Sequence, residues 1–172
     1  FVFGLSVTAV MLVWALIDGF SSPDLLPLIP NLILLSLFYA LANIFLFKAF
    51  KIAEASEVSI LLASSTIWSV LSAIIMLGEK LTVVKIVATL LVFSGVALVD
   101  YSKSKWSLNR GHLFALLSAI FFGVAFTNDA FIVGKFNNVS SYMFIAFLLP
   151  SLTVILFDLK SIGQVRHFIQ PK

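Results

Sequence analysis

The sequence predicts an all-α membrane protein, built as a polytopic bundle of transmembrane helices. The mean hydropathy of the chain is +1.13. Of its 172 residues, 61% are hydrophobic and only 11% are charged, whereas a soluble domain carries about 25% charged residues. The chain therefore has too few polar side chains to cover a surface that faces water. Its apolar runs are continuous rather than alternating, which excludes a transmembrane β-barrel.

Six apolar runs make up most of the chain, and each is interpreted as one helical span because about 20 residues cross the apolar core of a bilayer. The loop between the first two runs, 18–30, contains three prolines, and proline discourages helix. The charged turn 79–82 makes the third and fourth runs a hairpin, and the polar segment 102–112 precedes the fifth. The predicted spans are residues 2–17, 31–47, 58–78, 81–99, 113–134 and 136–157.

The polar residues exclude several classes of function. The net charge is +3, but the basic residues lie in short segments between apolar runs, where they serve topology and lipid headgroups rather than a nucleic acid. The chain has no cysteine, so it has no disulfide or thiolate metal site. The two histidines, His112 and His167, lie in separate polar segments and suggest no metal pair. We therefore predict no enzyme, no cofactor, no metal and no nucleic-acid partner.

Residues 58–78 are rich in small and hydroxyl side chains. Small residues let helices pack closely in lipid, where no hydrophobic force drives association, so this helix is predicted to lie at the centre of the bundle. Its hydroxyls serve either helix packing, by bonding back to the backbone, or the wall of a polar cavity, and both interpretations stay open. One face carries Ser59, Ala63, Thr66 and Ala73, and a neighbouring face carries Ser65, Ser69 and Ser72.

Two polar side chains stand inside otherwise apolar runs. Asn43 is near the middle of its span, with Ser36 and Tyr39 on roughly the same face. A buried amide is costly without partners, so Asn43 serves either a neighbouring helix or a solute. Asp129 is the one carboxylate within the six runs. It is a candidate for proton transfer or cation binding, or else a hydrated position close to the end of its helix.

The hairpin carries the pattern that suggests a family. Lys48-Ala49-Phe50 precedes it, the turn reads Met76-Leu77-Gly78-Glu79-Lys80-Leu81, and Gly95 stands near the end of its second helix. With these residues, 47–101 resembles the EamA-like families of the drug/metabolite transporter superfamily. The segment from Gly111 to Ala119 is similar to the usual start of the sixth helix in that family.

The resemblance implies a fold of ten helices in two inverted five-helix repeats. Residues 1–101 would then be an incomplete first repeat with helices two to five, 102–112 a polar connection, and 113–172 the start of the second repeat with helices six and seven. The first helix and the last three would lie outside this sequence. The family often has a proline in helix four where this chain has Thr66, so a hydroxyl cluster is predicted to replace a kink.

The resemblance also implies a function, that of a secondary transporter. Such a permease moves a small organic metabolite or drug by alternating access around a cavity between the repeats. Its partners would be the solute, the lipid bilayer of a plasma membrane or bacterial inner membrane, and a coupling proton or cation, for which Asp129 is the candidate. Gly78 and Glu79 are predicted to form a structural turn. The candidates for lining the cavity are Tyr39, Asn43, Ser65, Thr66, Trp68 and Ser69.

Two questions stay open at this stage. The alternative function is a non-transporting assembly or sensory module that binds other helices through its small-residue faces. A second Gly-Glu hairpin in the full-length sequence would favour the transporter. The orientation is also open, because the positive-inside rule makes the side with 48–57, 101–112 and 158–172 cytoplasmic, whereas the usual family topology places the Gly78-Glu79 turn in the cytoplasm.

Overall fold

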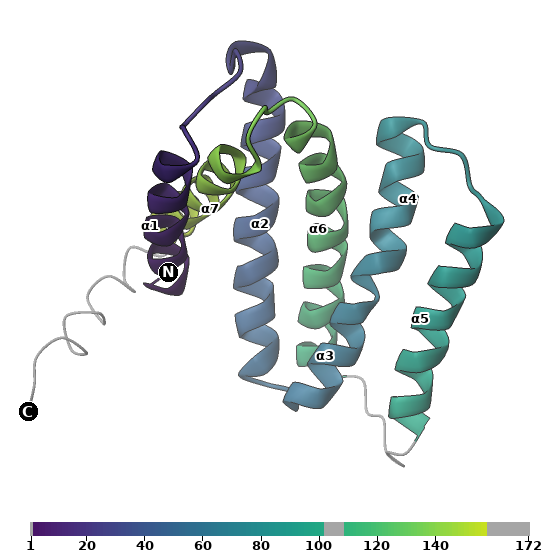
Figure 1. Cartoon of the computed structure of the whole chain (residues 1–172). Helices are drawn as coiled ribbons and strands as arrows, with labels where there is room; N and C mark the ends of the chain where they lie inside the picture. The colour runs from purple at the N-terminus through teal and green to yellow at the C-terminus, as the bar shows by residue number, and fades with distance from the viewer. Residues whose placement is uncertain (1, 102–108, 158–172) are drawn as a thin grey trace, which may run out of the picture. The chain divides into compact units, whose positions relative to one another are not determined.

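The chain folds into α-helices throughout the part that the computed structural model describes, residues 2–101 and 109–157 (Figure 1). Most of the predicted polar connection and the segment 158–172 lie outside this part. Within it, four helical stretches are long and apolar enough to cross a membrane, and two shorter apolar helices accompany them. The prediction of an all-α membrane protein is confirmed. The four stretches are Leu26–Phe50, Ala55–Leu77, Arg110–Val133 and Val139–Leu156, and the shorter helices are Gly4–Ile17 and Val83–Gly95.

Each predicted span corresponds to a helix, except that the third is divided into two. The elements in order are α1 (Val2–Ile17), the 3-10 turn η1 (Leu26–Leu28), α2 (Ile29–Phe50), α3 (Ala55–Ala63), α4 (Ser65–Leu77), α5 (Val83–Tyr101), α6 (Arg110–Val133) and α7 (Val139–Phe157).

The predicted span 58–78 corresponds to one apolar helical stretch, Ala55–Leu77, in which the regular helix is interrupted at Ser64. The Ser64 hydroxyl donates to the Leu61 carbonyl at 2.6 Å, and the Ser64 N–H donates to the same oxygen at 3.1 Å. A serine hydroxyl that competes for backbone groups weakens regular helix. The prediction that a hydroxyl cluster replaces a kink at Thr66 stays a prediction, and the interruption lies two residues before Thr66.

The predicted loop 18–30 is shorter in the structure. It includes η1, and α2 begins at Ile29 rather than Asn31. Pro30 stands in the first turn of α2, where its missing N–H takes no bond from the helix. The sixth span begins at Val139 rather than Phe136, so helix starts were the least accurate part of the prediction.

The described part of the chain divides into two compact units, and the first contains residues 2–40 and 132–157. In it α1 packs against α7 (Figure 1), and Gly4 lies directly against the Ser151 side chain. The loop after α1 is tied to the start of α7, because the Ser140 hydroxyl donates to the Asp18 carboxylate at 2.6 Å and the Asn138 amide donates to the Gly19 carbonyl at 2.7 Å. The buried apolar core of this unit is Leu28, Leu32, Leu35, Ile132, Phe136 and Tyr142.

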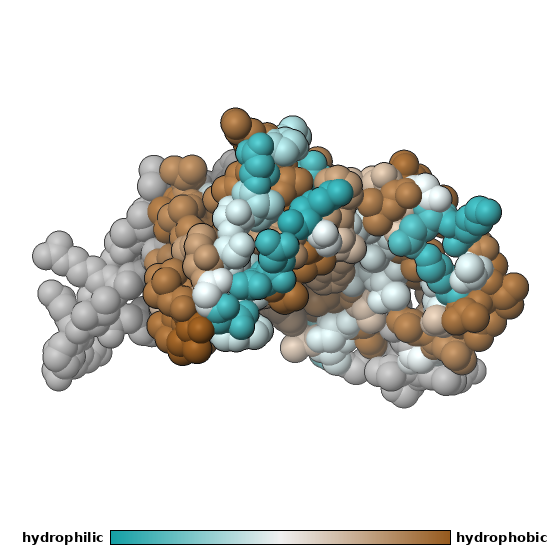
Figure 2. Space-filling model, turned by 45° about the horizontal axis from the view of Figure 1, so that its top comes forward, coloured by the Kyte–Doolittle hydropathy of each residue, from teal (hydrophilic) through white to brown (hydrophobic). Residues whose placement is uncertain are grey.

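The second unit contains the described residues 41–101 and 109–131 and most of the predicted site. In it α5 packs against α3 and α4 (Figure 1). Brown apolar side chains make up much of the visible surface, and teal hydrophilic side chains gather in patches (Figure 2). Exposed apolar area of this extent marks contact with lipid or another apolar partner. Among residues 83–95 of α5 the exposed large apolar side chains are Val83, Val84, Ile86, Val87, Leu90, Leu91, Val92 and Phe93. The predicted division into repeats at 101 and 113 stays a prediction.

Candidate functional site

In the second unit, α6 approaches α4 very closely at Gly123. A Cβ atom on Gly123 would stand 2.5 Å from the Trp68 Cβ, 2.7 Å from the Ser65 carbonyl oxygen and 2.8 Å from the Ser69 nitrogen. Real Cβ atoms do not approach other atoms this closely. The glycine therefore lets the backbone of α6 lie directly on α4, as small residues do between membrane helices.

One turn further along, a pair of buried hydroxyls joins the same two helices. The Ser72 and Thr127 hydroxyl oxygens are 2.6 Å apart. The Ser69 carbonyl oxygen lies 3.0 Å from each of them, so it accepts a bond from whichever hydroxyl does not donate to the other. Both hydroxyls are thereby satisfied inside the packed interface, which a buried polar group requires.

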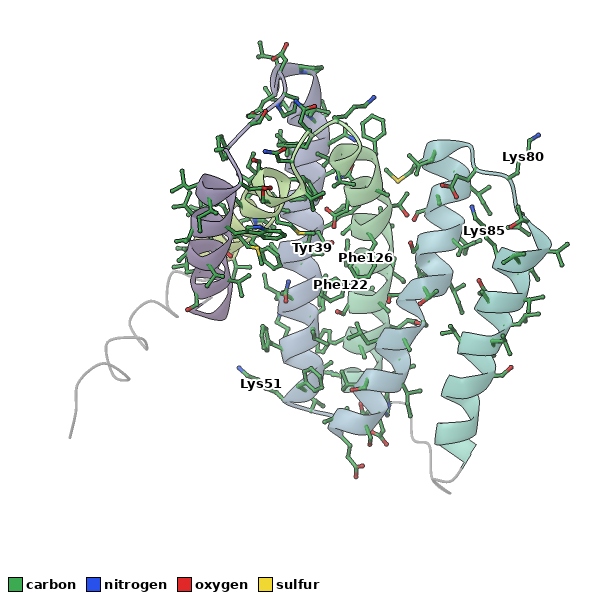
Figure 3. The ribbon with its side chains drawn as sticks, viewed as in Figure 1. Tyr39, Lys51, Lys80, Lys85, Phe122 and Phe126 are labelled. Atoms are coloured by element: carbon green, nitrogen blue, oxygen red, sulfur yellow. The ribbon has the colours of Figure 1, made fainter. Side chains whose placement is uncertain are left out.

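The structure brings three of the six predicted cavity residues together. Ser65, Trp68 and Ser69 lie half-buried on α4 at the contact with Gly123. Thr66 is exposed on the same helix, and Asn43 is half-buried on α2 in the second unit. The sixth residue, Tyr39, is half-buried on the part of α2 that belongs to the first unit (Figure 3). Their role as cavity residues stays a prediction.

The surroundings of Asn43 show how α2 and α6 are held together within the second unit. The neighbouring Ala42 carbonyl accepts a 2.8 Å hydrogen bond from the Ser118 hydroxyl of α6, and both residues are fully buried. A hydroxyl that bonds a carbonyl of another helix satisfies itself and adds to the packing. Asn43 thus stands next to a tight polar contact between two helices.

An aromatic column lies nearer the end of α2. The Phe45 ring stacks on Phe114 at 5.9 Å and on Phe121 at 5.7 Å between centroids, with interplanar angles of 18° and 12°. The Lys48 ammonium is 5.8 Å from the centroids of Phe45 and Phe114. This distance is within the range of a cation–π interaction. The stacked rings therefore already interact with the ammonium group of Lys48.

Asp129, the predicted coupling residue, is half-buried on α6, which ends four residues later at Val133. Its neighbour Asn128 is buried. On the preceding turns Phe122 and Phe126 stack at 5.8 Å with an interplanar angle of 22° (Figure 3). Asp129 thus lies near one end of α6, directly after Asn128 and three residues after Phe126 in the sequence, and its role in proton or cation coupling stays a prediction.

Gly78 and Glu79 lie in the turn between α4 and α5. Gly78 ends α4 with φ +64°, a left-handed conformation that glycine adopts without strain. The Glu79 carboxylate pairs with the Lys85 ammonium at the start of α5, and Lys80 is exposed beside them (Figure 3). The turn thus combines a helix cap with an ion pair across the connection.

Sequence reasoning missed a buried pair formed by Glu57 of α3 and His112 of α6. The His112 Nε2 atom is 3.1 Å from the Glu57 Oε2 atom, and the two side chains are only 3% and 17% exposed. The missed signal is the spacing of capping boxes, present in Glu54-x-x-Glu57 and in Asn109-x-x-His112. Gly123 and Thr127 were also missed, although two small residues four apart on one helix indicate a packing face.

The chemistry of these contacts is that of a polar helical interior rather than of a metal centre. Among residues 2–101 and 109–157, no three histidine, aspartate or glutamate side chains come together in a way that would hold a metal ion. The polar contacts between α2, α4 and α6 are made by hydroxyls and carbonyls, whereas the contact between α3 and α6 is made by the Glu57 carboxylate and the His112 ring.

Comparison with known proteins assigns the chain to a family. The model of the EamA-like transporter family matches residues 1–100, which include α1 to α4 and nearly all of α5. Comparison with curated proteins and with solved structures gave no match. The family match covers more than half of the 172 residues and includes the hairpin with the Gly78-Glu79 turn. The protein therefore belongs to the EamA-like transporter family.

Proposed function

We propose that this protein is a secondary transporter that moves a small organic metabolite or drug across a plasma membrane or a bacterial inner membrane by alternating access. The observation that carries the proposal is the match to the EamA-like transporter family over residues 1–100. The helices of the described part are apolar, and several are long enough to span a membrane. A gradient across the membrane is the driving force that such a transporter uses.

The six candidates for solute contact fall into two groups, because only Ser65 and Ser69 have backbone atoms at the contact of α4 with Gly123. Tyr39 and Asn43 of α2 and Thr66 and Trp68 of α4 are half-buried or exposed polar and aromatic side chains, and we propose that they contact the solute. The backbone atoms of Ser65 and Ser69 meet Gly123. We therefore propose that substitutions of these two serines affect transport mainly through the packing of α4 on α6.

The contacts of the small residues favour the transporter over the helix-binding module. The face of α4 with Ser65, Ser69 and Ser72 is covered by Gly123 and Thr127 of α6 within the same unit, whereas Thr66 on the neighbouring face is exposed. Gly4 of α1 likewise lies against Ser151 of α7 within the first unit. The two occupied faces are not free to bind the helix of another protein, and among the small-residue faces only the one with the exposed Ser59 and Thr66 would serve the helix-binding module.

The experiment that tests the proposal is uptake into lipid vesicles that contain the full-length protein, screened over a mixture of metabolites. We expect saturable uptake of at least one solute above empty vesicles. Asn43→Ala is expected to lower the uptake at least tenfold while the protein still inserts and folds. Ser94→Ala is the matched control, because that hydroxyl is exposed on α5 and donates only to the Leu90 carbonyl of its own helix at 2.7 Å.

Asp129→Asn tests the coupling site in the same vesicles. The variant keeps the size of the side chain and removes its charge. If Asp129 carries the coupling proton or cation, solute exchange continues in the variant, but uptake no longer responds to the ion gradient. A wild-type protein that is folded and moves no solute across a broad panel would overturn the proposed function. Unchanged gradient dependence in Asp129→Asn would overturn the assignment of the acid alone.

A further inference from the structure

Three exposed basic side chains gather in the second unit where α2 ends and α6 begins. Lys48 lies in the last turn of α2, Lys51 directly follows that helix, and Arg110 is the first residue of α6. The two helix ends are close together, because a Cβ atom on Gly111 would lie 2.7 Å from the Ala53 Cβ. The Lys51 side chain projects away from the helices (Figure 3). This end of the unit therefore presents several positive charges in one region.

Two aromatic rings hold the Lys48 ammonium at the boundary between α2 and α6. It lies 5.8 Å from the ring centroid of Phe45 on its own helix and 5.8 Å from that of Phe114 on α6. Arg110 precedes Phe114 by four residues, and residues four apart lie on the same face of a helix. The face of α6 that the Lys48 ammonium contacts thus also carries Arg110.

The three basic side chains have no anionic partner within the part of the chain that the structure describes. No carboxylate of that part forms an ion pair with any of them. The acidic residues that follow α2 have other roles, because Glu54 and Glu57 form the capping box of α3 and Glu57 also contacts the His112 ring. At the other end of α4, by contrast, Lys85 is paired with Glu79. The charges at the end of α2 and the start of α6 are therefore available to an anion from outside the chain.

Large apolar side chains are exposed next to these charges. They are Phe47, Phe50, Ile52 and Leu113. The end of α2 and the start of α6 each bound a stretch that is long and apolar enough to cross a membrane, so both lie where the apolar core of a bilayer meets its headgroups. A soluble anion would use only the basic side chains. A phospholipid would use both kinds of group, since its headgroup is charged and its acyl chains are apolar.

We propose that Lys48, Lys51 and Arg110 form a binding site for the headgroup of an anionic phospholipid. The phosphate of the lipid lies among the three basic side chains, and its acyl chains lie along the exposed apolar side chains of α2 and α6. The rings of Phe45 and Phe114 keep the Lys48 ammonium at the boundary of the two helices, so less side-chain freedom is lost when the lipid binds.

The chemistry of the three side chains determines which lipids the site distinguishes. An arginine guanidinium binds two phosphate oxygens at once, and a lysine ammonium attracts the phosphate as a point charge. Phosphatidylcholine has the same phosphate as phosphatidylglycerol, but its choline cation cancels the charge. The site should therefore prefer phosphatidylglycerol. Each basic side chain close to an anionic lipid strengthens the binding about fivefold.

Native mass spectrometry of the full-length protein in detergent measures this preference, because it resolves the first lipid molecule that binds. The protein is titrated with phosphatidylglycerol and, separately, with phosphatidylcholine of the same acyl chains. We expect the wild type to bind phosphatidylglycerol about tenfold or more tightly than phosphatidylcholine. The preference should decrease as the ionic strength is raised, because salt screens exposed charges.

Variants locate the site on the protein. Lys48→Gln, Lys51→Gln and Arg110→Gln each remove one charge and should each weaken the binding of phosphatidylglycerol about fivefold, with the binding of phosphatidylcholine unchanged. Lys80→Gln is the matched control, because Lys80 is also exposed but lies in the turn between α4 and α5. A triple variant with Lys48→Arg, Lys51→Arg and Arg110→Lys keeps the three charges and should keep the preference. This variant separates a loss of charge from a disturbed fold.

Four results would overturn the proposal. The first is equal binding of the two lipids to the wild type, and the second is unchanged binding of phosphatidylglycerol in the three glutamine variants. The third is an equal loss in Lys80→Gln, because the preference would then reflect the net charge of the protein rather than a site. The fourth is a charge-conserving triple variant that loses the preference. These measurements need no solute and no transport, so this proposal and the proposed function can fail independently.

Discussion

At the scale of single residues, three glycines show how one residue type serves three purposes in this chain. Gly78 adopts a left-handed backbone conformation, with φ +64°, and Gly123 lets α6 pack closely against α4. Gly95 is helical and has open space around the place of a Cβ atom. The family pattern contains Gly78 and Gly95, but among the described glycines of the second unit it is Gly123 that has the nearest neighbouring atoms.

Replacing Gly78 and replacing Gly95 with alanine should therefore change the free energy of unfolding in opposite directions. Neither position has an atom within 4 Å of a new Cβ. The backbone conformation alone therefore determines the effect of each substitution on stability. Gly78→Ala places an L-residue in the left-handed region and should lower the free energy of unfolding by about 1–2 kcal/mol. Gly95→Ala replaces glycine inside α5 and should raise it by about 0.5–1 kcal/mol. Unfolding of the two variants in lipid or detergent measures both, and equal losses would contradict the assignment of Gly78 as a strained cap.

Gly123→Ala should destabilise the second unit by forcing α6 away from α4. The new methyl would meet the Trp68 Cβ at 2.5 Å and two backbone atoms of α4 below 3.0 Å. Backbone atoms cannot move aside as a flexible side chain can, so the loss should be about 1–3 kcal/mol. Gly95→Ala again serves as control in the same unfolding experiment. A Gly123→Ala variant as stable as the wild type would show that α4 and α6 do not touch here.

The sequence predicted some of these residue roles and not others. It indicated that the serines of 58–78 lie on packing faces, because their helical spacing is visible in the chain itself. It could not indicate that Ser72 meets Thr127 or that Glu57 meets His112, since both partners are 55 residues away along the chain. A single sequence contains no information on which of several polar segments come together.

At the scale of elements, the contact of α4 with α6 is the main new feature. The hydroxyl pair of Ser72 and Thr127 adds a polar link to an interface that Gly123 makes close. Hydrogen bonds between membrane helices contribute about 0.6 kcal/mol on average and up to about 1.7 kcal/mol. The contribution is modest because the Ser69 carbonyl still accepts one hydroxyl when the other is removed.

A double-mutant cycle with Ser72→Ala and Thr127→Val should reveal this link. Each single variant removes the same hydroxyl–hydroxyl bond, so the double variant should lose less stability than the sum of the two, by about 0.5–1.5 kcal/mol. Ser94→Ala with Thr127→Val is the matched cycle, because Ser94 bonds only within α5. Additive losses in the first cycle would mean that the two hydroxyls do not interact.

Helix boundaries illustrate what local patterns can and cannot predict. The first predicted span, 2–17, has the same bounds as α1. It was predictable because the apolar run ends at a loop that contains glycine and prolines. The interruption at Ser64 was not predicted, because a serine inside an apolar run is compatible with a continuous helix. Its hydroxyl and its N–H both bond the Leu61 carbonyl only in the folded structure.

At the scale of the whole molecule, the described helices and the family match agree on a membrane protein. Composition alone predicted this class, because 61% hydrophobic residues in continuous runs cannot form a water-soluble surface. The hairpin with the Gly78-Glu79 turn predicted the family. The function follows from the family rather than from any one contact, so transport is the claim that most needs a direct test.

The most direct test is solute counterflow in vesicles that contain the full-length protein. Vesicles are loaded with an excess of one unlabelled solute from the uptake screen, and a trace of the labelled solute is added outside without ATP. A secondary transporter exchanges the two, so the account predicts a transient accumulation of label inside that empty vesicles lack and Asn43→Ala reduces at least tenfold. If the folded wild-type protein gives no counterflow for any solute of the screen, the account of this chain as a transporter is wrong.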